Sequence, residues 1–498
     1  KPITYGAYGS GDKPKIYGSQ EITGWSLYKG NIYKAKVESD INQLFLDGEK
    51  MKLARYPDSG YSIIDAVGSK TNFTDNSLPN FSHVGATFIC RTNAWGVETK
   101  TVVGGNHNQN LSINSAPLYP LSVGDGYFLA NKLEYLTAPQ VFYFDTNSKT
   151  VYLWTPTGES PANYSIRGSY LTTGMLINNR DHIVVENLDL LHASDIGLSA
   201  DYCEHLTINN VGIHFPEAEG LRINHDSNGN YQNNYINGAS NNGIWANTSD
   251  SKFLDNRVYN TALLENLGVT GMGGPMEGVA IYNPYGRNNI FRYNRIENVG
   301  YIGIRWDTPN TIIDKNYIKN VCLVKDDGGA IYTWTSNYAN TGVSGSSVTN
   351  NIVLYSRGTK EGGVLDRTYG YGIYMDNNIK DVLIQGNTIA YSGNGGIYLH
   401  ENGNITVDDN TILDALYGIY SDEENENCLI TRNIVYVFEK NFDNFSDTRV
   451  VGQRKGATHI YNNNKYYSKH KVGTFRSQDS FLTFENWKSA TGQDANST

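Results

Sequence analysis

From about residue 166 onward, short apolar runs and polar turns alternate along the chain at a nearly fixed spacing. Each run is rich in β-branched residues and follows an asparagine, as in Asn-Tyr-Ile-Lys-Asn-Val and Asn-Thr-Ile-Ala-Tyr-Ser. Most intervals between these asparagines are 22–24 residues, and three are longer, at 38, 35 and 36 residues. The repeated positions are Asn187, Asn210, Asn234, Asn256, Asn294, Asn316, Asn351, Asn387, Asn410 and Asn433.

A second pattern, a glycine followed by an apolar residue, keeps the same phase. A fixed period near 23 residues, made of short strands and turns, is typical of a solenoid. No segment has a convincing apolar period of about 3.6 residues, so helical repeats fit poorly. In a parallel β-helix, equivalent residues of successive coils stack about 4.8 Å apart, and we expect the asparagines to hydrogen-bond along the axis. The glycine pattern recurs at Gly220, Gly243, Gly303, Gly372, Gly396 and Gly418.

The segments outside this repeat divide the rest of the chain. Residues 1–29 read as the first coil or coils, because a strand, a glycine-rich turn and another strand follow one another. Residues 30–165 hold aromatic-rich alternating runs, such as 43–48 and 150–154, with turn signals between them. We interpret 30–165 as a β-rich, sandwich-like inserted domain and 166–464 as the β-helix with its groove. Residues 465–498 leave the repeat and are expected to cap its end, which blocks edge-to-edge pairing.

Composition narrows the classes of partner. The chain has 498 residues with 51 glycines, 37 tyrosines and a mean hydropathy of -0.46, which favours a turn-rich β-protein. Its net charge of -10 argues against nucleic acid as a partner, and no apolar run approaches the length of a membrane span. The chain starts at Lys1 without a signal-like segment, so we expect a processed product. Four widely separated cysteines are expected to be buried apolar residues, not zinc ligands: Cys90, Cys203, Cys322 and Cys428.

The three long intervals contain excursions at about 260–277, 335–347 and 356–370, on neighbouring coils. Insertions into a solenoid collect on its binding face, so the middle of the solenoid is the candidate site. When the coils are aligned on the glycine pattern, two polar surface columns appear, with Arg305, Tyr332, Tyr374 and Tyr398 between them. One column holds Glu217, Glu277 and Asp327, and the other holds Asn224, Asn247, Asp307, Trp334, Asp376, His400 and Asp422.

Carboxylates beside aromatic residues suit carbohydrate chemistry. Aromatic faces stack on sugar rings. Glycoside hydrolysis needs one carboxylic acid and one carboxylate, about 5–5.5 Å apart for retention and about 6.5–9.5 Å apart for inversion of the anomeric centre. Asp327 and Asp376 lie on adjacent coils, so their separation is expected to be of that order if both columns face one groove. The neighbouring Asp326 and Glu277 would raise the pKa of a partner by like-charge repulsion, as a catalytic acid requires. Asp326 is expected to tune this pKa or to hold a turn.

The repeat over about 166–440 resembles the right-handed parallel β-helix superfamily of pectate-lyase-like polysaccharide enzymes, and this resemblance implies the handedness. The motif Asp-Gly-Gly-Ala-Ile-Tyr (327–332), followed one coil later by Gly-Ile-Tyr-Met-Asp (372–376), is similar to bacterial β-helix glycosidases such as glycoside hydrolase family 141. Paired aspartates on neighbouring coils act in that family, which implies Asp327 and Asp376. Asn377 stands where such enzymes often have a second acid, so the role of the second carboxylate stays open.

We therefore predict an all-β, right-handed parallel β-helix of about ten or more coils that acts as a glycoside hydrolase on a polysaccharide or oligosaccharide. A monomer that is secreted and extracellular, periplasmic or at the cell surface is expected, without a cofactor or a catalytic metal; Ca²⁺ is considered as a structural ion or in the lyase alternative below. Besides Asp327 and Asp376, the candidates for catalysis are Glu277, Glu361 and Asp366. The candidates for substrate binding are Arg305, Asp307, Asp326, Tyr332, Trp334, Tyr374, His400 and Glu401.

Two other functions remain open from the sequence. A polysaccharide lyase would use Lys325, Lys360 or Arg367 as base, and the acidic clusters would hold Ca²⁺. The polar columns contain more acids than bases, which ranks the lyase second. A non-catalytic carbohydrate-binding solenoid or adhesin is disfavoured because a binding face rarely concentrates unpaired acids.

Overall fold

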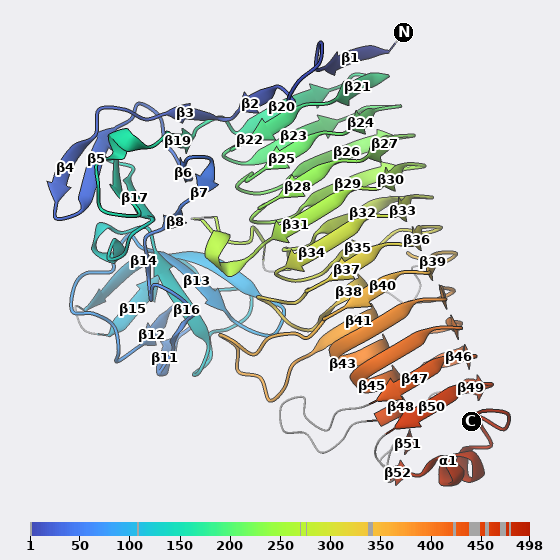
Figure 1. Cartoon of the computed structure of the whole chain (residues 1–498). Coiled ribbons are helices and arrows are strands. Elements are labelled where there is room, and N and C mark those ends of the chain that lie inside the picture. Colours follow the sequence, from blue (N-terminus) through green and yellow to red (C-terminus); the bar gives the residue numbers. More distant parts are fainter. Residues whose placement is uncertain are drawn as a thin grey trace.

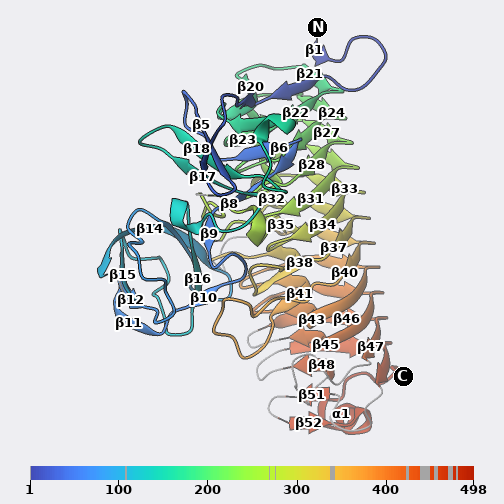
Figure 2. The same cartoon turned by 60° about the vertical axis from the view of Figure 1, so that its left-hand side comes forward.

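The chain folds into a parallel β-helix with an inserted β-domain beside its middle coils (Figures 1 and 2). The computed structural model describes residues 2–106, 109–268, 270–274, 276–336, 342–421, 425–437, 449–453, 458–468, 475–477 and 480–498. Within these ranges α1 (Phe484–Thr491) is the one α-helix. The predicted all-β fold class is confirmed.

One face of the β-helix is a parallel sheet to which each coil contributes one short strand. Apolar residues such as Ile208 and Val348, at the centres of these strands, point inward and are fully buried. Their neighbours in the strand point outward, as the two-residue period of a strand requires. The strands of this face are β1 (Ile3–Gly6), β21 (Ile183–Glu186), β24 (Thr207–Asn209), β27 (Asn230–Gln232), β30 (Lys252–Leu254), β33 (Ile290–Arg292), β36 (Ile312–Asp314), β39 (Ser347–Thr349), β42 (Leu383–Gln385), β44 (Thr406–Asp408), β46 (Glu426–Thr431) and β49 (Thr458–Asn462).

The other two faces merge into a single sheet, because β43 (Thr388–Leu399) and β45 (Thr411–Ser421) run unbroken from one face to the next. The second face contains β2 (Lys15–Tyr17), β22 (Asp189–Leu191), β25 (Gly212–His214), β28 (Tyr235–Asn237), β31 (Arg257–Thr261), β34 (Arg295–Val299), β37 (Tyr317–Lys319), β40 (Ile352–Leu354), β47 (Ile434–Val437) and β50 (Lys465–Ser468). The third contains β20 (Thr173–Asn178), β23 (Ile196–Asp201), β26 (Leu221–Ser227), β29 (Ile244–Ser249), β32 (Ile281–Arg287), β35 (Ile304–Trp306), β38 (Gly328–Thr333), β41 (Gly370–Met375), β48 (Arg449–Gln453), β51 (Phe475–Ser477) and β52 (Ser480–Leu482).

A buried asparagine ladder runs along the turn between the first and second faces. Asn316 illustrates its bonds: the side-chain amide donates to the carbonyl of Phe291 and to Oδ1 of Asn351, both at 2.9 Å. Its own Oδ1 accepts from the backbone and side-chain amides of Asn294, also at 2.9 Å. The expected hydrogen bonding along the axis is thus confirmed. The buried members are Asn234, Asn256, Asn294, Asn316, Asn351, Asn387, Asn410, Asn433 and Asn464.

Asn187 and Asn210 do not belong to this buried ladder, so their predicted place in it is wrong. They lie one position earlier in the turn, in the left-handed backbone region at φ 57° and 55°. The amide of Asn210 donates to Oδ1 of Asn187 at 2.7 Å in a partly exposed pair. The irregular interval of 24 residues before Asn234 records this shift of one position.

The ladder predicts a large loss of stability for Asn316→Ala. The substitution leaves the buried amide groups of Asn294 and the carbonyl of Phe291 without their partner, and each such group costs about 1–3 kcal/mol. We expect the free energy of unfolding to fall by at least about 3 kcal/mol, measured by denaturant titration. Asn247→Ala is the matched control, because it removes one half-exposed bond of 3.1 Å to Asn224. An equal loss of unfolding free energy in both variants would contradict the stabilising role assigned to the buried asparagine ladder.

The inserted domain lies between β2 and β20 and contains three sheets with two apolar cores. The largest contains β9 (Arg55–Tyr56), β10 (Ser62–Ile63), β11 (Ala66–Ser69), β12 (Asn72–Thr74), β13 (Thr87–Arg91), β14 (Val97–Asn106), β15 (Asn110–Ile113) and β16 (Gly126–Ala130). The others contain β4 (Ser26–Lys29), β5 (Ile32–Lys36), β8 (Lys52–Leu53), β17 (Val141–Asp145) and β18 (Thr150–Trp154), and β3 (Ser19–Glu21), β6 (Leu44–Leu46), β7 (Glu49–Lys50) and β19 (Ile166–Ser169). Short 3₁₀ turns are η1 (Leu133–Tyr135), η2 (Pro161–Asn163) and, in the β-helix, η3 (Leu264–Asn266).

Two segment boundaries in the structure differ from those predicted from the sequence. The inserted domain begins at about Ser19, not at residue 30, because β3 pairs with β19 and β4 pairs with β5. The repeat continues past residue 465, because β50 and β51 still pair in parallel with β47 and β48. The cap therefore consists of the antiparallel β52 and of α1, whose Trp487 is fully buried.

Two of the three excursions anchor the inserted domain. In the first, the carbonyl of Asn266 accepts from Nζ of Lys50 at 2.8 Å. In the third, the carbonyl of Gly362 accepts from the backbone amide of Gly126 at 2.8 Å. Within the expected excursion at 335–347, residues 337–341 lie outside the described residues. The inserted domain is therefore docked on the coils that carry the candidate acids.

The four cysteines are buried, as predicted. Among the described residues, no helix has the length and apolar character needed to cross a membrane.

Candidate active site

Two neighbouring strands, β38 and β41, position the candidate acids. They pair in parallel, with Tyr332 beside Tyr374. Asp327 directly precedes β38 and Asp376 directly follows β41. The two carboxylates therefore come from opposite ends of two adjacent parallel strands. Both line one cavity of about 370 Å³. The repeat therefore brings this predicted pair to a common cavity.

Asp327 sits in a tight turn at φ 55°, and its carbonyl accepts a hydrogen bond of 3.0 Å from the hydroxyl of Tyr301. Burial, followed by the negative charges of Asp376 and Asp326, raises the pKa of the Asp327 carboxyl to about 7. His400 acts in the opposite direction on this pKa. A carboxyl with this pKa is still partly protonated near neutrality, so it can donate a proton.

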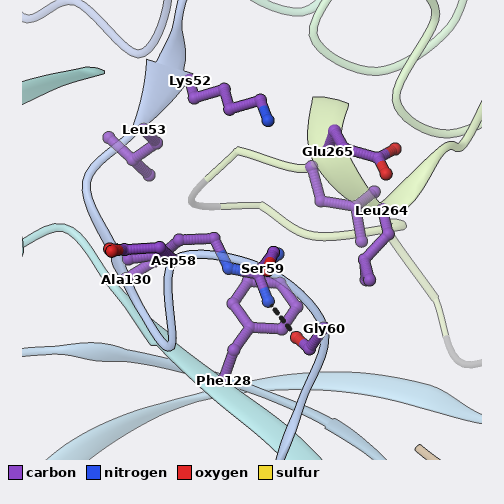
Figure 3. A pocket seen from close by; sticks show the side chains of 11 residues that line it. Lys52, Leu53, Asp58, Ser59, Gly60, Phe128, Ala130, Leu264 and Glu265 are labelled. Atoms are coloured by element: carbon purple, nitrogen blue, oxygen red, sulfur yellow. Dashed lines mark hydrogen bonds between the residues drawn. The ribbon is translucent and has the colours of Figure 1, made fainter. Parts of the chain in front are cut away.

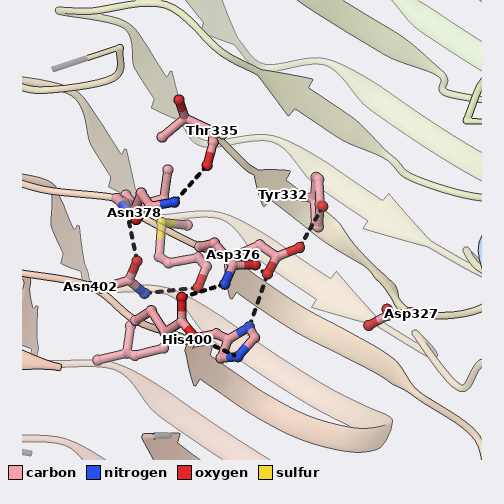
Figure 4. Close-up of polar contacts among 12 residues, drawn as sticks. Asp327, Tyr332, Thr335, Asp376, Asn378, His400 and Asn402 are labelled. Atoms are coloured by element: carbon pink, nitrogen blue, oxygen red, sulfur yellow. Dashed lines mark hydrogen bonds and ion pairs between the residues drawn. The ribbon is translucent and has the colours of Figure 1, made fainter. Parts of the chain in front are cut away.

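Asp376 is held by three hydrogen-bond donors (Figure 4). Its Oδ2 accepts from the hydroxyl of Tyr332 at 2.7 Å, and its Oδ1 accepts from the backbone amide of Asn377 at 2.8 Å. Nδ1 of His400 lies 3.0 Å from the same Oδ1. Asp327 lies apart from this network in Figure 4. Three contacts therefore fix the position of the Asp376 carboxyl group, and the two acids have different environments.

His400 and Glu401 complete the wall below Asp376. The imidazole stacks on Tyr398, with ring centroids 5.5 Å apart and planes at 13°. Glu401 accepts from the side-chain amide of Asn377 at 2.6 Å, and its other oxygen lies 3.9 Å from Nε2 of His400. His400 lines the cavity, whereas Glu401 supports the turn that follows Asp376.

A second cavity of about 620 Å³ adjoins the first and shares Trp95, Asp327, Tyr374 and His400 with it. Together they form the catalytic cleft, the name used below for both cavities. The smaller one is lined by Trp95, Tyr119, Met276, Tyr301, Asp327, Tyr332, Trp334, Tyr374, Asp376, Asn377 and His400. The larger one is lined by Thr92, Asn93, Ala94, Trp95, Ser122, Asp125, Asp327, Val364, Leu365, Tyr369, Tyr371, Tyr374, Tyr398 and His400.

Asp326 and Glu277 support the site from outside the cleft. Asp326 is buried, and its Oδ2 accepts from the backbone amide of Tyr369 at 2.8 Å. Its own backbone amide donates to the carbonyl of Ala94 in the inserted domain at 2.7 Å. Oε2 of Glu277 accepts from the side chain of Asn242 at 2.7 Å. Asp326 thus ties three segments together behind Asp327.

Arg305 and Asp307 form an ion pair one coil above the acids. Nε and Nη2 of Arg305 lie 3.2 and 3.1 Å from Oδ2 of Asp307. The guanidinium is 4.7 Å from the ring centre of Tyr282 and 5.7 Å from that of Tyr332, and Arg305 is only 6% exposed. The pair therefore packs against Tyr332 from the preceding coil and does not line the cleft.

The structure does not bring Glu361 and Asp366 to the acids. Both are exposed in the third excursion. The backbone carbonyl of Glu361 accepts from Arg91 at 2.8 Å, and Asp366 accepts from the hydroxyl of Tyr369 at 2.6 Å. Asp422 lies outside the described residues.

Sequence reasoning missed the contribution of the inserted domain. Trp95, Tyr119 and Asp125 of that domain line the cleft, and no repeat or motif marks them in the sequence. Asp125 is buried, which raises the pKa of its carboxyl to about 6. Only the position of the excursions facing that domain could have indicated its contact with the acids.

A third cavity, at the contact between the domains, is a packing gap (Figure 3). It measures about 80 Å³ and is lined by Lys52 and Phe128 of the inserted domain and by Leu264 and Glu265 of η3. Ligand sites usually measure about 300–1,000 Å³, so this space is too small for a sugar ring with its contacts. Across the described residues, no group of three or more His, Cys, Asp or Glu side chains is arranged to hold a metal ion.

Comparisons with known proteins place this geometry in context. The family described as "Right handed beta helix region" matches residues 173–364 and 277–488. A solved structure titled "Glycoside hydrolase" superposes with a TM-score of 0.68 at 15% identity, covering 80% of this chain and 83% of the other. The complex of XylC with xylose superposes with a TM-score of 0.50 at 13% identity, covering 96% and 77%. No curated protein sequence matches significantly.

Proposed function

This chain belongs to the right-handed β-helix family, and we propose that it is a glycoside hydrolase that cleaves a polysaccharide or oligosaccharide in the catalytic cleft. Identities of 15% and 13% to the solved structures establish the fold only, so the proposal rests on the site. One observation carries it: Asp327, with a pKa raised to about 7, shares a cavity with the hydrogen-bonded Asp376.

In the proposed reaction Asp327 is the general acid. It donates its proton to the glycosidic oxygen as the bond to the anomeric carbon breaks, and the released sugar leaves as an alcohol. Asp376 supplies the negative charge on the other side, either by attacking the anomeric carbon or by taking a proton from the water that attacks it. Water provides the hydroxyl group of the new sugar end. Its remaining proton replaces the one that Asp327 gave away, directly if Asp327 activates the water that cleaves the sugar from Asp376, and through solvent if Asp376 has taken it.

The hydrogen bonds around Asp376 suit this second role. Tyr332 and His400 hold its two oxygens in fixed positions, so the carboxylate needs little reorganisation when charge develops on the sugar. Tyr332 is 4% exposed and packed edge-on against Tyr374 at 5.2 Å, which fixes the donor. Tyr332 and His400 are therefore positioning residues for Asp376.

The lining of the cleft favours hydrolysis over elimination. A lyase would need a cation to neutralise a uronate, and no Lys or Arg is among the described residues that line either cavity. Lys325 is buried against the ring of Tyr301, with its Nζ 4.2 Å from the ring centre. The proposed substrate also implies a location. We propose that the protein is extracellular or lies at the cell surface, because polysaccharide substrates lie there.

A panel of plant, algal and animal glycans tests the function. Hydrolysis releases reducing ends without an unsaturated sugar, and this is the expected result. Unsaturated products, detected by ultraviolet absorbance, would establish a lyase. Binding of a glycan by affinity electrophoresis with no product after prolonged incubation would establish a carbohydrate-binding solenoid.

The raised pKa predicts the pH dependence. Because the acid must carry its proton, kcat/KM is expected to fall as pH rises through about 7. Asp326→Asn removes one of the charges that raise the pKa of Asp327, so the alkaline limb should move to lower pH. Asp381→Asn is the control, since Asp381 is exposed and bonds to Asn404 at 2.9 Å on an outer turn. A limb that stays in place in Asp326→Asn would exclude Asp327 as the titrating acid.

A further inference from the structure

Resting on the proposed hydrolysis, we infer that the substrate is an uncharged glycan chain that fills both cavities of the cleft, with Trp95 of the inserted domain as its central binding residue. The inserted domain then acts as half of the substrate site. The inference follows from the charges, the aromatic lining and the anchoring of the loop that carries Trp95.

The charges of the cleft exclude an anionic substrate. The acidic residues that line it are Asp125, Asp327 and Asp376, and His400 is the one residue of basic type among the described lining residues. Arg305, on the coil above, is paired with Asp307 and buried. Sites for carboxylate or sulfate groups use Arg or Lys to pair with them. A uronate or a sulfated sugar would meet three acidic side chains here and, among the described lining residues, no Arg or Lys to pair with.

Aromatic residues lie on both sides of the acids. Tyr119 and Trp334 line the smaller cavity, and Tyr369 and Tyr371 line the larger one. Such rings bind the apolar faces of sugars without requiring charge. Both volumes, about 370 and 620 Å³, lie in the range of ligand sites. Asp327 lies in both linings, so the cleaved bond sits at the junction and sugars extend to either side.

Trp95 occupies this junction on the wall opposite the β-helix. Its backbone amide donates to Oδ1 of Asn93 at 3.0 Å, and its indole packs edge-on against Tyr119 at 5.5 Å and 87°. The neighbouring carbonyl of Ala94 accepts from Asp326 at 2.7 Å and from Arg91 at 3.2 Å. The loop is thus tied to the residue beside Asp327, so Trp95 is held in place before substrate binds.

Chain-length dependence tests the inference. We would measure kcat/KM on neutral xylo-, cello-, manno- and arabino-oligosaccharides of increasing length, and on oligogalacturonate, oligoalginate and chondroitin sulfate fragments. A neutral series is expected to be cleaved, with kcat/KM rising with length until both cavities are filled. In Trp95→Ala, KM for the longer oligomers should rise by about tenfold to thirtyfold, a larger change than that in kcat.

The control is Tyr28→Ala, an aromatic residue of the inserted domain that is 43% exposed and lies outside both cleft linings. It should leave all constants unchanged. Hydrolysis of the anionic fragments only, or equal kcat/KM for monoglycosides and long oligomers, would overturn the inference while leaving the hydrolase proposal standing. Absence of any hydrolysis, with unsaturated products or none, would instead overturn the proposed function.

Discussion

Replacing Asp327 with asparagine is expected to lower kcat/KM on the natural glycan by about 10²–10⁴-fold, the usual contribution of a general acid. The amide has nearly the same shape but cannot donate a carboxylic proton to the glycosidic oxygen. Asp326→Asn should cost far less, because Asp326 does not line the cleft and acts on the pKa of Asp327. Activity is measured by reducing-end release, with Asp381→Asn as the control.

Asp327→Asn should not destabilise the fold at neutral pH. The pKa of Asp327 is about 7 in the folded protein, against 3.8 for an ordinary aspartate. The folded state therefore loses stability as pH rises from about 4 to about 7, where the unfolded chain is already ionised. Asparagine removes this penalty, so Tm of Asp327→Asn should equal or exceed wild type at pH above about 7. A lower Tm there would assign the lost activity to misfolding.

Asp376→Asn is the second large effect, with an expected loss in kcat of about 10³-fold or more. The asparagine cannot attack the anomeric carbon or accept a proton from water. It also cannot accept hydrogen bonds at both ends, so some stability is lost with the charge. Reducing-end release at saturating substrate measures the effect.

Tyr332→Phe separates the lost charge from the lost hydrogen bond. It removes the 2.7 Å bond to Oδ2 of Asp376 but keeps the carboxylate. We expect kcat to fall by about tenfold, the equivalent of roughly 1.4 kcal/mol. If Tyr332→Phe and Asp376→Asn were equally impaired, Asp376 would be a structural residue and not a reacting one.

The repeat is the part of this molecule that the sequence predicts well. Each coil places equivalent residues on the same face, so the alignment of the coils on the glycine pattern was enough to put Asp327 and Asp376 in two neighbouring surface columns. The asparagine ladder follows for the same reason, since an amide in a repeated turn has a partner one coil away. The alignment was wrong by one residue at Asn187 and Asn210. Because neighbouring residues of an extended chain point to opposite sides, that shift moves the side chain from the buried ladder to a partly exposed position.

The excursions and the inserted domain could not be predicted in this way. Loops without a period leave the direction of a side chain undetermined, so Glu361 and Asp366 looked equivalent to residues that face the cleft. Trp95 lies more than 200 residues from Asp327 in the sequence, and its place depends on how β13 and β14 dock against the coils. The boundary near Ser19 was missed because β3 pairs with β19, a partner almost 150 residues away.

The most direct test of the catalytic pair compares the two asparagine variants on two substrates of the same sugar, the natural glycoside and its dinitrophenyl glycoside. Dinitrophenolate leaves without protonation, so a missing general acid no longer matters. Asp327→Asn is predicted to regain kcat/KM, which reports departure of the leaving group, within about tenfold of wild type on the activated substrate, while Asp376→Asn stays impaired on both. An Asp327→Asn enzyme as slow on the dinitrophenyl glycoside as on the natural substrate would contradict the assignment of Asp327 as the acid.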